Sequence, residues 1–193
     1  MWMDKGVSNW ILENVSIYEG LNNILKFILQ INSFGLLWII AIGVFVLLDY
    51  KKTKKVDLSY IFFVIPVLIG ICIMLFGIAP IFQRPHPYDE IQGFIELKDS
   101  LSLSSICTYS LPSMSAFTSI AYTFILVHKE KEHKTYYFIA AFIMCAIELI
   151  LGVSYISDLL FGAGLGIIFA SLGNILQKVI MKLINKKDVT LWD

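Results

Sequence analysis

Long apolar stretches constrain this chain more than any other feature. Four of them carry no charge over roughly the 20 residues that a helix needs to cross a bilayer core: Phe27–Leu48, Leu58–Gln83, Leu101–Val127 and Leu159–Gln177. A fifth, Thr135–Ser157, contains Glu148 as its one charged residue. Hydrocarbon offers no water to free backbone groups, and no stretch alternates as a barrel strand would, so helices are expected. The sequence therefore predicts an all-α integral membrane protein.

Five transmembrane helices in a single domain, residues 1–193, are expected at about residues 27–48, 58–82, 111–127, 135–153 and 157–178. The composition agrees, because 58% of residues are hydrophobic and 16% are charged. Residues 1–25 mix Trp, Ile and Leu with Asp, Glu and Asn, which predicts a helix lying in the membrane interface. One sizeable loop is expected outside the membrane, at about residues 81–109.

The placement of the cations predicts an orientation. Eleven of the 15 Lys and Arg residues fall between or after spans that share one side: Lys51, Lys52, Lys54, Lys55, Lys129, Lys131, Lys134, Lys178, Lys182, Lys186 and Lys187. Because cytoplasmic loops are enriched in Lys and Arg, the N-terminus is expected outside and the C-terminus in the cytoplasm.

Gly162, Gly164 and Gly166 in the last span favour close approach of another helix. Packing within the bundle is the simpler interpretation, and a homodimer through this face remains an alternative.

Three short segments from distant parts of the sequence fall on the same predicted outer side. They are Gln83-Arg84-Pro85-His86-Pro87, the stretch from Tyr109 to Phe117 around Pro112-Ser113, and the stretch from Leu151 to Asp158. Pro112-Ser113 is a plausible helix start, whose free backbone amides would suit an anion. A guanidinium such as that of Arg84 is well shaped for a phosphate.

The order and spacing of these segments resemble the type 2 phosphatidic acid phosphatase (PAP2) superfamily. Its motifs are Lys, six residues, Arg-Pro; then Pro-Ser-Gly-His; then Ser-Arg, five residues, His, three residues, Asp. The resemblance implies a five-helix PAP2-like bundle in a bacterial-type cell membrane, acting on lipid phosphates or undecaprenyl diphosphate at the outer face. It also implies that the Lys and Arg residues hold phosphate, one His is the nucleophile and the other His protonates the leaving group.

This chain departs from that pattern at most of the catalytic positions. The motifs keep Arg84, Pro85, Pro112, Ser113 and Asp158, but they have Gly77 for Lys, Met114-Ser115 for Gly-His, Ile147-Glu148 for Ser-Arg and Ser154 for the nucleophilic His. A serine hydroxyl lacks the near-neutral pKa of imidazole, so Ser115 is not a ready proton donor. Ser154 could attack only if a base activated it, and Asp158 is normally a weak base.

Glu148 places a potential anion where the family places a cation, which disfavours a bound phosphate. An ionisable residue within a span is a functional candidate. The plainer alternative is a structural ion pair between Glu148 and Arg84. His86, the one histidine on the predicted outer side, could assist anion binding or serve as a surrogate nucleophile, or it could have only a loop role. Ser113, Ser115 and Ser154 are candidate ligand contacts or small packing residues, and Asp158 could simply cap the last helix.

The favoured hypothesis is therefore a catalytically inactive PAP2-like membrane protein that binds a membrane lipid, a phosphorylated lipid carrier or a partner protein through this cleft. The alternative is a divergent lipid phosphatase or phosphotransferase that uses Arg84, His86, Ser154 and Asp158 in rearranged roles. A small transporter is a weaker third possibility, since five spans suit an inverted repeat poorly. The sequence gives no support for a metal, a cofactor or a nucleic-acid partner.

Overall fold

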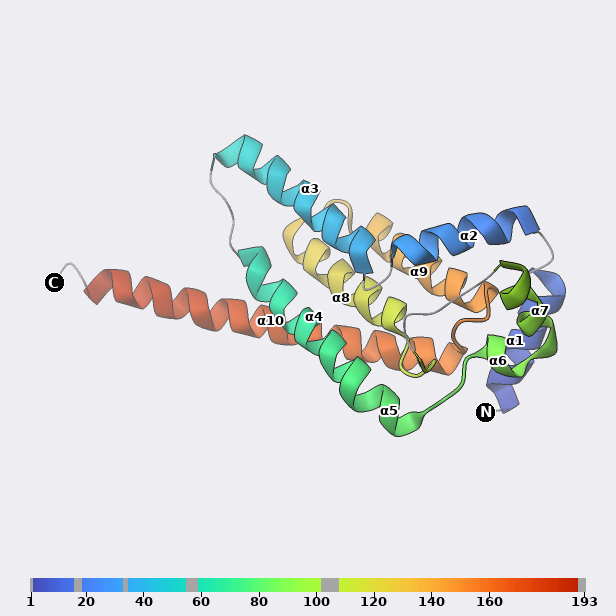
Figure 1. The fold of residues 1–193 in the computed structure, drawn as a ribbon. Helices are drawn as coiled ribbons and strands as arrows, with labels where there is room; N and C mark the ends of the chain where they lie inside the picture. The colour runs from blue at the N-terminus through green and yellow to red at the C-terminus, as the bar shows by residue number, and fades with distance from the viewer. Residues whose placement is uncertain (1, 16–18, 33–34, 55–58, 102–107, 191–193) are drawn as a thin grey trace.

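The computed structural model describes residues 2–15, 19–32, 35–54, 59–101 and 108–190, and these residues form helices joined by short connections (Figure 1). In chain order the helices are α1 (Trp2–Asn14), α2 (Glu19–Ile31), α3 (Leu36–Thr53), α4 (Ser59–Ile73), a π-helical turn η2 (Met74–Ile78), α5 (Ala79–Phe82), α6 (Pro87–Glu90), α7 (Gln92–Leu101), α8 (Met114–Lys129), α9 (Lys134–Ile150) and α10 (Ile156–Thr190). The predicted all-helical class is confirmed for the described residues.

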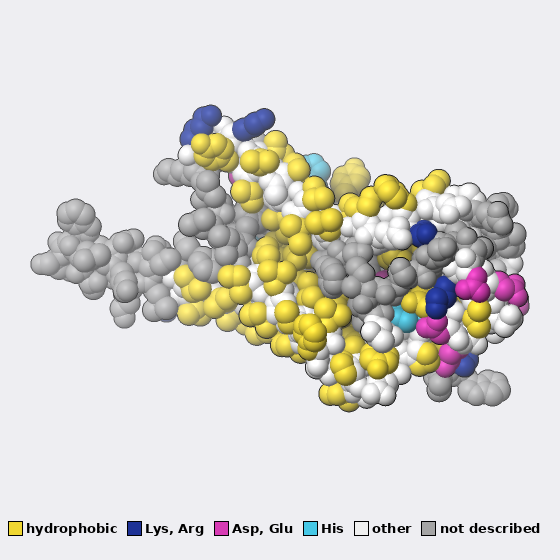
Figure 2. Space-filling view, viewed as in Figure 1, with side chains coloured by type: hydrophobic (Ala, Val, Ile, Leu, Met, Phe, Trp, Pro, Cys, Tyr) yellow, Lys and Arg dark blue, Asp and Glu magenta, His cyan; other side chains and the backbone are white. Residues whose placement is uncertain are grey.

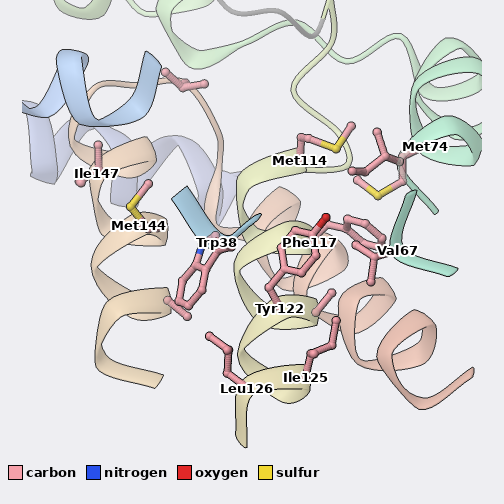
Figure 3. Packing of buried hydrophobic residues seen from close by; sticks show 14 of the residues in the cluster. Trp38, Val67, Met74, Met114, Phe117, Tyr122, Ile125, Leu126, Met144 and Ile147 are labelled. Carbon is pink, nitrogen blue, oxygen red and sulfur yellow. The ribbon is translucent and has the colours of Figure 1, made fainter. Parts of the chain in front are cut away.

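Helix α8 forms the centre of the bundle. It contacts α10, α9, α4 and α3, and its side chains Phe117, Tyr122 and Ile125 are fully buried. Trp38 of α3 and Val67 of α4 pack around them (Figure 3). Because this core surrounds α8, the start of α8 has a fixed position relative to the helices beside it.

Glycines bring α10 against α8. A Cβ atom at Gly162 would lie 2.3 Å from the carbonyl oxygen of Ser113, and one at Gly166 would lie 2.6 Å from that of Phe117. At Gly164 a Cβ atom would meet nothing within 4 Å. The predicted packing role is therefore confirmed for Gly162 and Gly166, whereas Gly164 points into open space.

Two described helical segments are long and apolar enough to cross a membrane, Val64–Glu90 and Ile156–Ile180. A third crossing is possible if α2 and α3, which meet at a bend of 62°, form one broken span. Apolar side chains face outward on several helices, and Phe76, Phe142 and Leu160 are each at least 70% exposed. Figure 2 shows hydrophobic side chains over the middle of the molecule and charged side chains toward its ends. The molecule thus has the surface of an integral membrane protein, while five spans remain a prediction.

The N-terminal part differs from the sequence-based prediction. Residues 2–25 contain two helices, α1 and the first half of α2, rather than one. The predicted span 27–48 is also not one helix, because α2 ends at Ile31 and α3 begins at Leu36. Gly35 lies between them with a φ of 76°, a conformation that favours glycine, and it packs against Thr118 of α8. The predicted outer loop, residues 81–109, is partly helical: its described part contains the end of α5 and the helices α6 and α7.

Candidate functional site

Backbone hydrogen bonds bring the three predicted segments together at one end of the bundle. The Ser110 N–H donates to the Arg84 carbonyl over 2.9 Å, the Tyr88 N–H donates to the Gly152 carbonyl over 2.9 Å, and the Ser113 N–H donates to the Asp158 carbonyl over 3.2 Å. Helices α1, α6 and α7 lie at the same end (Figure 1). The predicted convergence of these segments is therefore present in the fold.

Four side chains form what we call the arginine cluster: Asp4, Arg84, Ser157 and Asp158. The guanidinium of Arg84 donates through Nη1 to Asp158 Oδ1 at 2.5 Å and to Ser157 Oγ at 2.7 Å. Its Nη2 donates to Asp4 Oδ2 at 2.9 Å. The guanidinium carbon also lies 4.1 Å from the centre of the Tyr155 ring, a cation–π distance. Arg84 thus joins α1 to the start of α10.

Asp158 has a structural role in addition to its ion pair. Helix α10 begins at Ile156, and Asp158 Oδ2 accepts a hydrogen bond from the Tyr155 N–H at 3.0 Å. A side chain at the third helical position that bonds the N-cap amide is one half of a capping box. The prediction that Asp158 caps the last helix is confirmed, and its carboxylate is held by both this amide and Arg84.

Glu148 lies in a second group of side chains, the glutamate cluster, with Ser113 and Ser154. The Ser113 hydroxyl donates to Glu148 Oε2 at 2.6 Å, and Ser154 also forms a side-chain hydrogen bond with Glu148. Glu148 is 5% exposed. The suggested pair between Glu148 and Arg84 is wrong, because Asp4 and Asp158 occupy the two Nη atoms of Arg84.

Ser113 is fully engaged within the protein. Besides donating to Glu148, its hydroxyl accepts a hydrogen bond from the Ala116 N–H at 3.1 Å, as the N-cap of α8. The predicted helix start at Pro112-Ser113 is therefore confirmed. In this arrangement the hydroxyl proton of Ser113 is directed to Glu148, and a phosphate could use it only by displacing that carboxylate.

His86 and Ser115 contact other parts of the molecule. His86 is 3% exposed, its Nδ1 lies 2.5 Å from the Val153 carbonyl oxygen, and its ring stacks on Tyr88. A carbonyl oxygen can only accept, so Nδ1 carries the proton in this contact. The Ser115 hydroxyl accepts from Asn32 Nδ2 at 3.4 Å. The structure thus brings Arg84, Ser113, Glu148, Ser154 and Asp158 into the two clusters and ties Ser115 to the end of α2.

Two residues of the arginine cluster, Asp4 and Ser157, were not singled out from the sequence. Ser157 could have been noticed because it directly precedes Asp158 at the start of a predicted helix. Asp4 gave no such signal, since it lies outside every motif and its partners are 80 and 153 residues away. Within the described residues, no group of three or more His, Cys, Asp or Glu side chains could hold a metal ion.

The carboxylate of Asp4 makes a pH-dependent contribution to stability. Burial alone would raise the pKa of Asp4, but hydrogen bonds from Arg84 and Ser157 outweigh it and hold the pKa below its ordinary value of 3.8. A group with a lowered pKa stabilises the fold above that ordinary value, and the contribution is lost as the pH falls through the folded-state pKa. We therefore expect Asp4→Asn to cost about 1–2 kcal/mol near neutral pH.

The difference in unfolding free energy between the wild type and Asp4→Asn should shrink as the pH falls below 3.8 and approaches the lower pKa that Asp4 has in the folded state. Unfolding free energies in mixed detergent micelles at about pH 6 and about pH 3 measure it. Glu13→Gln, which changes an exposed carboxylate of the same helix, is the matched control. A difference between wild type and Asp4→Asn that does not depend on pH would contradict the assignment.

Comparisons with known proteins support the fold. No protein-family model matches the sequence, and no curated protein matches it. The structure is similar to the crystal structure of a transmembrane PAP2-type phosphatidylglycerolphosphate phosphatase from Bacillus subtilis, with a TM-score of 0.59 and 18% sequence identity. The match covers 92% of this chain and 86% of that protein. The chain therefore has a PAP2-like fold, as its three motif-like segments predict.

Proposed function

We propose that this chain is a membrane protein that binds a phosphorylated lipid at the outer face of a bacterial-type cell membrane and does not hydrolyse it. The observation that carries the proposal is the buried carboxylate of Glu148, to which Ser113 and Ser154 direct their hydroxyls. In the proposed membrane orientation the N-terminus lies outside and the C-terminus lies in the cytoplasm, as the lysine distribution predicts.

Phosphate-ester hydrolysis needs a nucleophile, a proton donor and positive charge around the transferred phosphoryl group. The glutamate cluster supplies hydroxyls and a carboxylate instead. A carboxylate beside a phosphate dianion is unfavourable, because two like charges in a site of low dielectric repel strongly. The one guanidinium nearby, that of Arg84, is already paired with two carboxylates. These features disfavour turnover.

The surroundings of Arg84 suit an anionic lipid. The Arg84 side chain is 19% exposed, so the arginine cluster lies near the surface of the molecule. Apolar side chains that adjoin the arginine cluster in sequence face outward: Ile81 is 78% exposed and Leu160 is 70% exposed. The rings of Phe82 and Phe161 meet edge to face at 6.1 Å and join the end of α5 to the first turns of α10. A cation beside an exposed apolar surface matches a phosphate headgroup with acyl chains.

We expect the purified protein to release no phosphate from phosphatidic acid, phosphatidylglycerolphosphate or undecaprenyl diphosphate, while it retains anionic lipid in native mass spectrometry. An active PAP2 phosphatase in the same detergent shows that the assay works. The variant Arg84→Gln/Asp158→Asn removes the cation together with its buried partner, and it should lose the retained lipid. Robust phosphate release that disappears in Ser154→Ala or His86→Ala would overturn the proposal.

One observation favours a second candidate, a divergent lipid phosphatase. The hydrogen bond between Ser154 and Glu148 could make the carboxylate a general base for a serine nucleophile, a role that the sequence suggested for Asp158. This candidate predicts slow phosphate release that Glu148→Gln abolishes, because an amide cannot accept the proton. The proposed binding protein shows no release in either form, so the same assay separates the two.

A further inference from the structure

The arginine cluster already contains a bound anion, which is the carboxylate of Asp4. The donors that hold it include Arg84 Nη2 at 2.9 Å, the Ser157 hydroxyl at 2.8 Å and the Ser157 N–H at 3.3 Å. A guanidinium, a hydroxyl and a backbone amide in the first turn of a helix are the donor types that bind phosphate oxygens. The carboxylate therefore occupies a set of donors that an external oxyanion would also use.

The two carboxylates on Arg84 are held differently. The Asp158 side chain has no exposed surface and is tied to the Tyr155 amide as well. The Asp4 side chain is 10% exposed and comes from the first turn of α1. The next residue, Lys5, pairs with Glu90 at 2.9 Å, and its side chain is 45% exposed. Asp158 is thus the more deeply buried and more firmly held of the two partners of Arg84, and Asp4 is the one nearer the surface.

Charge prevents the Asp4 carboxylate and an external oxyanion from occupying the arginine cluster at the same time. With Asp4 in place, one guanidinium faces two carboxylates, so the arginine cluster carries a net charge of −1 from these groups. A further anion would then be repelled. If Asp4 leaves, the remaining pair of Arg84 and Asp158 is neutral, and one edge of the guanidinium and the two donors of Ser157 become available. An incoming oxyanion must therefore replace Asp4 and cannot bind beside it.

We propose that Asp4 is an internal ligand of the arginine cluster, and that a lipid phosphate binds by displacing it. This inference rests on the proposed lipid-binding function and adds its regulation: α1 keeps the cluster occupied until a phosphate headgroup competes successfully. The exchange moves charges and hydrogen bonds only, and no covalent bond changes. The phosphate, rather than the glycerol or the acyl chains, is the group that takes the place of the carboxylate.

The test is a titration of the detergent-solubilised full chain with short-chain phosphatidic acid. Asp4→Asn keeps the size of the side chain and removes its charge. This variant should bind phosphatidic acid about 10-fold more tightly than the wild type, because it weakens the state in which residue 4 occupies the arginine cluster. Glu13→Gln is the matched control and should bind as the wild type does. Short-chain phosphatidylcholine should bind to none of the three proteins, since its phosphate carries a choline. Inorganic phosphate is a separate arm, and equally tight binding of it would overturn the assignment of a lipid as the ligand.

A second measurement requires no substitution. Saturating phosphatidic acid should speed amide hydrogen exchange in the first turns of the wild-type α1, and phosphatidylcholine should not. Three results together would overturn the displacement and leave the proposed function standing. Wild type and Asp4→Asn would bind phosphatidic acid with equal affinity, hydrogen exchange in α1 would not change, and Arg84→Gln/Asp158→Asn would abolish the binding. If no variant binds phosphatidic acid, both the displacement and the proposed function are wrong.

Discussion

Replacing Arg84 with Gln is expected to lower the free energy of unfolding by about 3–5 kcal/mol. Arg84 is the ion-pair partner of Asp158, whose side chain has no exposed surface. Removing one member of a buried pair leaves the other charge without compensation, and that penalty exceeds the value of an exposed pair. The loss should be measured as the shift of an unfolding curve in mixed detergent micelles.

Lys98→Gln is the control for the loss of a surface cation. Lys98 pairs with Asp89 at 2.6 Å, but the two side chains are 34% and 39% exposed, so this change should cost less than about 1 kcal/mol. The double variant Arg84→Gln/Asp158→Asn should recover at least half of the loss, because it also removes the more deeply buried of the two carboxylates that Arg84→Gln leaves unpaired. If Arg84→Gln costs no more than Lys98→Gln, the arginine cluster does not stabilise the fold as described.

Gly162→Ala is expected to cost about 3 kcal/mol, since its methyl group would lie 2.3 Å from the Ser113 carbonyl oxygen. That oxygen belongs to the backbone at the start of α8, so relief requires moving one helix away from the other. The movement would also disturb the hydrogen bond from Ser113 to Glu148. The same unfolding assay measures the cost.

Gly164→Ala provides an internal comparison within the same helix. Its methyl group would meet nothing within 4 Å, and alanine is the better helix former by up to about 1 kcal/mol. We therefore expect opposite signs for two identical substitutions that are two residues apart. Equal effects at the two positions would show that α10 does not pack on α8 through Gly162.

Local patterns in the sequence were sufficient to predict several features. The apolar stretches predicted helices, because hydrocarbon forces the backbone to satisfy its own hydrogen bonds. Pro112-Ser113 predicted a helix start, and Asp158 predicted a cap, because both roles depend on residues within four positions of one another. The three motif-like segments predicted their own convergence and the PAP2-like fold. Each of these predictions follows from neighbours in the sequence or from a known order of segments.

The partners of the charged side chains were harder to predict. A pair between the oppositely charged Arg84 and Glu148 was one of two interpretations of Glu148, but each side chain has other partners. Charge alone makes many pairings favourable, and only the positions of α1 and α10 decide which carboxylates reach the guanidinium. The break between α2 and α3 was not predicted either, and Gly35 at this break lies close to Thr118 of α8, which is distant in the sequence.

From the sequence alone, the apolar stretches predict a helical membrane protein, and the three motif-like segments predict their own convergence at one end of the bundle. The partners of the buried charges came from the folded structure: Asp4, 80 residues before Arg84, accepts from the guanidinium, and the hydroxyls of Ser113 and Ser154 bond to Glu148. The two kinds of interaction differ in how far apart in the sequence their partners lie. Backbone hydrogen bonding and capping act over one helical turn, whereas a buried charge takes whichever partner the packing of distant helices brings within about 3 Å.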